Sequence, residues 1–222
     1  MGHPRLPSVA GPALLAGALF VAVAGLCHPM LSGDGPAQLE TIVATSAWRA
    51  VHLALIAGEI LLVAGVAGFA IRHADTPGAG AARAGALLFA FGVALALIQI
   101  MFMVGAASAL AGAYARGYPG IAATQAVFMY DMFHPFAQVA GRAGEFALGL
   151  ALATLGWGTL SGGILPRWLG YGGVAAGVLC ALWAVGVRES DPGLMAGVGL
   201  VTVWALAGGL VLVVGSTARQ QA

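Results

Sequence analysis

Six long apolar segments constrain the fold of this chain more than any other feature of its sequence. Hydrophobic residues make up 60% of its 222 positions and charged residues only 8%, whereas soluble domains carry about 25% charged residues. A helix needs roughly 20 residues to cross a bilayer core, and only helices satisfy the backbone of an open chain in lipid. We therefore expect an all-α, polytopic transmembrane bundle with short loops and six spans, at about 9–27, 47–71, 83–112, 135–160, 167–187 and 193–215.

The composition also limits the classes of function. The spans leave little chain for an extramembrane domain, so residues 1–222 are expected to form a single integral membrane domain. All basic residues are arginine and none form a run, so nucleic-acid binding has no electrostatic basis. The absence of lysine excludes a lysine Schiff base. Cys27 and Cys180 are too few for a disulfide framework.

Arginines near the span ends predict that both termini face the cytoplasm. On that orientation five arginines lie inside, and Arg49, Arg116 and Arg188 lie outside; the inner five are Arg5, Arg72, Arg83, Arg167 and Arg219. The Ala, Gly and Arg bias is typical of a GC-rich bacterial genome, so we expect a bacterial inner membrane. A second interpretation remains open, because Arg5, the first apolar stretch and residues 22–24 also resemble a cleavable secretory signal.

Two connections, 28–46 and 113–133, are longer than the others and both lie outside on this orientation. The part at about 118–133 is unusually apolar for a loop. Segments of that length and character are more often interfacial or re-entrant than fully spanning. We expect it to lie over the outer mouth of the bundle.

Polar residues inside the spans form two stripes. In the second span Arg49, His52 and Glu59 recur at offsets of three and seven, and in the fourth four polar residues recur at offsets of four, four and three: His134, Gln138, Arg142 and Glu145. Such spacings place residues on one helix face. Charges inside a membrane usually face the protein interior and are functional. We expect the two stripes to face each other across an outward-facing polar cavity.

The deepest members of these stripes predict a proton-carrying layer. Glu59, Arg142 and Glu145 fall near the bilayer midplane, and Gln99 of the third span could add a hydrogen bond. One carboxylate can pair with Arg142, and the other is expected to hold a proton. The alternative is a satisfied polar clasp that joins the second and fourth spans.

Three histidines, His28, His52 and His134, end or begin spans on the outer side. Three imidazoles at one level could bind Zn or Cu with an open coordination position, and Asp131 and Met132, together with Met30, could complete a copper or mixed site. Alternatively His52 and His134 could be the axial ligands of a b-type haem. The third interpretation is that these histidines bond only to loops or lipid headgroups.

Glycine spacing predicts close helix packing, since small residues bring membrane helices together. The second span places Gly58, Gly65 and Gly68 on one face, and the fourth places Gly141, Gly144 and Gly149 on another. The triplet Ala-Gly-Glu occurs in both spans, at 57–59 and at 143–145, as a parallel repeat would place it.

Three functions follow from these residues. The first is a haem- or metal-binding redox or accessory subunit using His28, His52 and His134. The second is a proton-coupled small-solute transporter using Glu59, Arg142 and Glu145, and the third is a non-catalytic membrane scaffold. The expected partners are the lipid bilayer and either other membrane subunits or a second copy of the chain.

Overall fold

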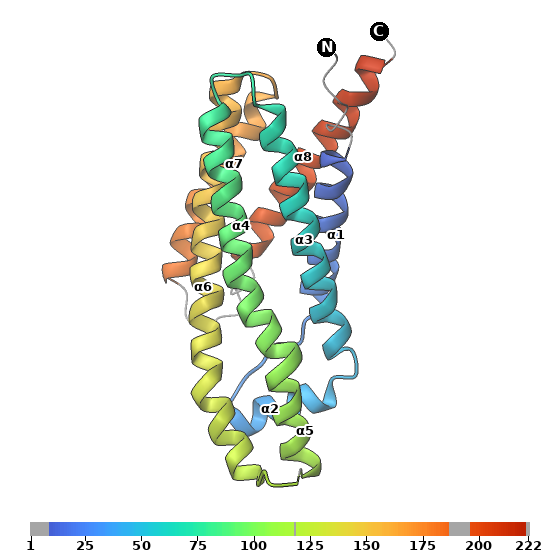
Figure 1. Ribbon diagram of the computed structural model, residues 1–222, viewed down its shortest axis with the longest axis vertical. Helices are drawn as coiled ribbons and strands as arrows, with labels where there is room; N and C mark the ends of the chain where they lie inside the picture. Colours follow the sequence, from blue (N-terminus) through green and yellow to red (C-terminus); the bar gives the residue numbers. More distant parts are fainter. Residues whose placement is uncertain (1–8, 118, 187–195, 221–222) are drawn as a thin grey trace.

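The computed structural model describes residues 9–117, 119–186 and 196–220, with side chains through residue 215 (Figure 1). This described chain is 87% helical and has no strand. Arg5 and Arg188, and the side chain of Arg219, lie outside it. Its elements are α1 Ala10–Cys27, α2 Gly35–Ala44, α3 Trp48–Arg72, α4 Ala79–Phe102, the π-helical turn η2 Met103–Ala107, α5 Ser108–Arg116, α6 Ala123–Gly162, α7 Arg167–Gly186 and α8 Ala196–Gln220.

Six helical stretches of the described chain are long and apolar enough to cross a membrane, which confirms the predicted six-span, all-α bundle. The third is the continuous run α4–η2–α5. The α1 start and the α8 end lie at one end of the bundle, and α2, α5 and the start of α6 lie at the other, here named the α2 end (Figure 1). An even number of crossings requires this arrangement. Which end faces the cytoplasm stays a prediction.

The long helices pack as two groups. The first is α1, α3 and α8, and the second is α4, α6 and α7; α3 packs on α4, and α7 packs on α8, where the groups meet. Within each group the predicted glycines make close backbone contacts. A Cβ on Gly58 would lie 2.9 Å from the Gly17 carbonyl oxygen, and a Cβ on Gly144 would lie 2.7 Å from the Gly92 carbonyl oxygen. Helices this close exclude lipid between them.

The described part of the apolar segment at 118–133 is continuous with the helix of the fourth span rather than a separate helix, and its interfacial position stays a prediction. Residues 123–133 form the first turns of α6, a 40-residue helix that continues through Pro135. Proline is tolerated in such a helix where neighbouring elements hold both sides of it. Ala126 and Tyr130 are buried on one side of Pro135, and Ala137 and Ala140 are buried on the other. The helix therefore begins about three turns before the predicted start of the fourth span.

The predicted loop at 28–46 contains the short helix α2, which covers the α2 end of the bundle (Figure 1). Asp34 begins it by accepting a hydrogen bond from the Ala37 N–H at 3.2 Å, and Pro36 occupies the first turn, as N-terminal preferences expect. The Tyr130 hydroxyl donates to Gln38 Oε1 at 2.7 Å and ties α2 to α6. A second small core forms here from α2, α3, η2, α5 and α6, with buried Leu39, Ile42, Trp48, Met103, Ala107, Leu110, Ala111, Ala113, Ala126 and Tyr130.

Candidate functional site

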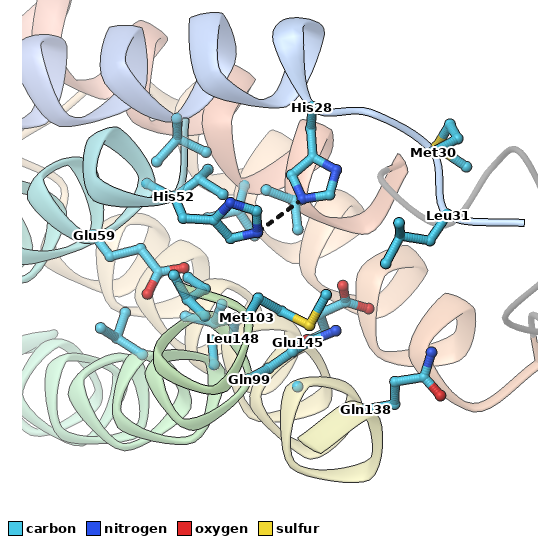
Figure 2. A pocket seen from close by; sticks show the side chains of 18 of the residues that line it. His28, Met30, Leu31, His52, Glu59, Gln99, Met103, Gln138, Glu145 and Leu148 are labelled. Atoms are coloured by element: carbon cyan, nitrogen blue, oxygen red, sulfur yellow. Dashed lines mark hydrogen bonds between the residues drawn. The ribbon is translucent and has the colours of Figure 1, made fainter. Parts of the chain in front are cut away.

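A cavity of about 620 Å³ lies between the two helix groups and reaches the chain segment between α1 and α2. Residues 28–33 of that segment line its outer part, and we name them the strap. Most of the lining is apolar. The polar side chains that line it are His28, Ser32, Gln38, His52, Glu59, Gln99, His134, Gln138, Glu145 and Thr202. Both predicted stripes thus contribute to one cavity, and Figure 2 labels six of these polar residues.

His28 and His52 meet at the outer part of the cavity, where their Nε2 atoms lie 3.3 Å apart (Figure 2). His52 Nδ1 lies 2.7 Å from the Trp48 carbonyl oxygen. A carbonyl only accepts, so this Nδ1 donates, and Nε2 of the neutral ring is then an acceptor. His28 Nε2–H therefore donates to His52 Nε2. Burial and the His52 imidazole lower the pKa of His28, against a backbone hydrogen bond at Pro29 that raises it.

Trp48 anchors this histidine pair. Its ring packs on His52 with centroids 4.4 Å apart and lies 5.8 Å from the His28 ring. Its Nε1–H donates to the Met103 carbonyl oxygen at 3.0 Å, which also accepts from Ser108 Oγ at 3.0 Å. Met103 is the first residue of the π-helical turn η2. Such single π turns occur frequently at functional sites.

Glu59 points into the cavity from α3, one and a half to two turns deeper than His52 (Figure 2). Its Oε2 atom is buried and has no hydrogen-bond partner in the described part of the protein. A buried polar atom without a partner is rare in folded proteins and needs an explanation. Here a proton or a bound cation would satisfy it.

Glu145 lines the same cavity from α6, on the opposite helix group. Its Oε2 atom lies close to α8, 3.9 Å from the position of a Cβ on Gly197. Arg142 is not among the lining residues, and its Nη1 donates to the Ala184 carbonyl oxygen of α7 at 3.4 Å. Gln99 covers Gly141, where a Cβ would collide with its amide oxygen. The structure thus brings Glu59, Glu145 and Gln99 to one cavity. Arg142 bonds to α7, while its positive charge still acts on the Glu145 carboxyl group.

The third histidine lies apart from the other two. His134 lines the cavity from α6, and its ring stacks on Tyr130 with centroids 4.7 Å apart. Asp131 lies against Gly35 at the start of α2, and Met132 is 61% exposed; neither lines the cavity. Among the described residues no three His, Cys, Asp or Glu side chains are grouped to hold a metal ion. Axial ligation of a haem by His52 and His134 stays a prediction.

Arg49 separates from its predicted stripe. It is exposed and lines a second pocket, of about 240 Å³, on the other side of Trp48. The sequence also did not identify Trp48, the strap or Thr202 of α8 as neighbours of the site. Tryptophans at span ends usually belong to the aromatic belt of a membrane protein, whereas the bond of Trp48 to Met103 joins residues 55 positions apart. No local pattern encodes such a contact.

Comparisons with protein-family models, with characterised proteins and with solved structures found no match for this chain. Its description as a multi-pass membrane bundle with a polar cavity therefore rests on its own residues.

Proposed function

We propose that this protein binds a small, partly apolar solute with a positively charged group in the cavity, and moves it across the membrane coupled to protons. The observation that carries the proposal is the buried Oε2 of Glu59, which has no partner in the described chain. Burial of an uncompensated carboxylate is costly. A proton and a cationic solute are two alternative ways to neutralise it.

Competition between these two ligands supplies the coupling. If Glu59 can hold either a proton or a cation but not both, then each ligand weakens the binding of the other by the same factor. Glu145 faces the same cavity from the other helix group, and none of the described residues that line it is an arginine or lysine. The charges that face the cavity therefore favour a cation over an anion.

The volume and lining of the cavity indicate what kind of cation it suits. Small-molecule sites are typically about 300–1,000 Å³ and mainly apolar, with few polar groups, and this cavity has about 620 Å³. Leu55, Phe89 and Val93 are among the residues that form its walls, so the solute is expected to have an apolar body. Val66, Leu152 and Leu155 do not line the cavity and are buried in the main hydrophobic core. Transport requires part of this core to open.

A flux measurement in liposomes tests the proposal. The purified protein is reconstituted with a pH-sensitive dye inside, and tetramethylammonium, benzyltrimethylammonium and tetraphenylphosphonium are added outside. We expect proton flux driven by at least one cation, lost in Glu59→Gln and kept in Glu40→Gln, a carboxyl outside the cavity that accepts from the Tyr114 hydroxyl. No flux and no cation binding by the wild-type protein would contradict the proposal. Loss of stability alone would favour the scaffold.

The second candidate function is metal binding by His28 and His52. Two nitrogens at about 2.0–2.1 Å from a tetrahedral ion lie about 3.3–3.4 Å apart, which matches the observed 3.3 Å. The bond from His52 Nδ1 to Trp48 fixes the Nε2 lone pair toward that point, as the outer contacts of metal ligands do. Water or solute would supply the remaining ligands.

Titration of the metal-free protein with Co²⁺ and Zn²⁺ tests this candidate. Binding should be lost in His28→Gln and in His52→Gln, and it should persist in His134→Gln. An absorption spectrum and elemental analysis of the purified protein test the haem hypothesis in the same sample. Location in a bacterial inner membrane, with the α2 end outward, is part of both proposals.

A further inference from the structure

The second pocket lies at the α2 end, between the α2–α3 turn and the helical segment η2–α5. Its volume is about 240 Å³. Two arginines from different helices line it, Arg49 of α3 and Arg116 of α5, together with the hydroxyl residues Thr45, Ser46 and Ser108. It is separate from the cavity, because the two share no lining residue.

The electrostatics of this pocket favour an anion. None of the described residues that line it is Asp or Glu. The acidic residue of α2, Glu40, is outside the lining and accepts a hydrogen bond from the Tyr114 hydroxyl at 3.1 Å. Arg49 lies in the first turn of α3, where the helix dipole adds partial positive charge. Two guanidinium groups and a helix N-terminus therefore all attract an anion to this pocket.

The hydrogen-bond donors of the pocket match a phosphate group. The hydroxyls of Thr45 and Ser108 already donate to backbone carbonyls, at 2.7 and 3.0 Å. The remaining donors are the two guanidinium groups and Ser46. Gly112 makes room for one of them, because a Cβ there would lie 2.8 Å from Arg116 Nη2. Planar guanidinium groups bind phosphate oxygens in pairs, so two arginines suit one tetrahedral anion.

The level of the pocket in the membrane indicates where such an anion would come from. Helix α3 has 25 residues, about 37 Å at 1.5 Å per residue, which is slightly more than the roughly 30 Å hydrocarbon core. Its first turn, with Arg49, therefore lies at one membrane interface. Lipid phosphates are found at that level, and basic pockets between helices bind lipid headgroups.

We propose that the pocket lined by Arg49, Arg116 and Ser46 is a binding site for a phosphate-bearing anion, either the phosphodiester of an anionic lipid headgroup or free phosphate. The site is independent of the proposed transport function. Because α3 also carries His52 and Glu59, an anion bound at its first turn would hold this end of α3 against α5.

Two arms of one experiment distinguish the sources of phosphate. In the first, native mass spectrometry measures retention of phosphatidylglycerol against phosphatidylcholine by the detergent-purified protein. In the second, the same protein is titrated with inorganic phosphate and its thermal unfolding is followed. The variants are Arg49→Gln, Arg116→Gln and their combination, with Arg83→Gln as the matched control. Arg83 is an exposed arginine on α4 at the opposite end of the bundle.

We expect selective retention of phosphatidylglycerol, weakened about tenfold by each single variant, which corresponds to about 1.4 kcal/mol, and unchanged in Arg83→Gln. Stabilisation by inorganic phosphate without lipid selectivity would assign the site to the free anion. Arg→Lys variants, which keep the charge, test the paired geometry if the glutamine variants do not fold. Wild-type protein that binds neither ligand, or a double glutamine variant that binds lipid as the wild type does, would overturn the proposal.

Discussion

Replacement of Glu59 by glutamine distinguishes a binding site from a structural clasp. The two interpretations differ in what the carboxyl group contacts. In a clasp the group would be one partner of a buried ion pair, and removal of its charge would leave the other partner uncompensated, at a cost of about 3–5 kcal/mol. In the structure Oε2 of Glu59 is buried and has no partner within the described chain.

The expected magnitude follows from that geometry. Glutamine has nearly the shape of a protonated glutamate, and the substitution breaks no bond to Oε2. We therefore expect the free energy of unfolding to change by less than about 1 kcal/mol, the scale of one net hydrogen bond, while cation-driven proton flux is lost. Reversible unfolding in mixed micelles measures the first quantity, and the liposome assay measures the second. A loss of 3 kcal/mol or more would refute the reasoning and favour the clasp.

Three further outcomes test other parts of the structure. Trp48→Phe removes the Nε1–H donor to Met103 and should lower the free energy of unfolding by about 1–3 kcal/mol, measured by the same unfolding assay. Gly144→Val should lower the free energy of unfolding by about 1–3 kcal/mol, because the valine side chain would overlap the α4 backbone. The control is Gly80→Val, since a Cβ on Gly80 meets nothing within 4 Å. The pKa of His28 is lowered in the folded protein. As the pH falls, His28 therefore becomes protonated in the unfolded chain before it does in the folded protein. Stability should decrease from about pH 7 toward pH 5, and His28→Gln should reduce that dependence in unfolding measured across this range.

Five of the seven residues in the predicted stripes line the cavity, and simple helix geometry explains the two that do not. Each residue of a helix rotates the side-chain direction by about 100°. A side chain seven positions later therefore points about 20° away from the first, whereas one three positions later points about 60° away. His52 and Glu59 therefore share a face, and Arg49 points to the neighbouring one. On α6, Glu145 lies about 20° from His134 but Arg142 about 80° away, toward α7.

The α2 end could not be predicted in the same way. Its small core depends on contacts between residues far apart in sequence, such as Tyr130 with Gln38 across 92 positions. Hydropathy described the segment at 118–133 correctly as apolar, but it could not separate its two faces. Ile121, Ala126, Val127 and Tyr130 pack in the small core with α2 and α5, whereas Phe128, Met129, Met132 and Phe133 are exposed. The strap likewise has no periodic pattern, and its position is set by where α1 ends and α2 begins.

The repeated triplet Ala-Gly-Glu has the same spatial role in both helix groups. Gly58 packs against the α1 backbone and Gly144 packs against the α4 backbone, so each glycine sets the closest approach inside its own group. The next residue is turned by about 100°, which directs Glu59 and Glu145 toward the space between the groups. Close packing and the polar lining are thus consequences of one local pattern. Because both carboxyls face one cavity from different helix groups, movement of one group against the other would change the distance between the two side chains to which the proposed function assigns proton and cation binding.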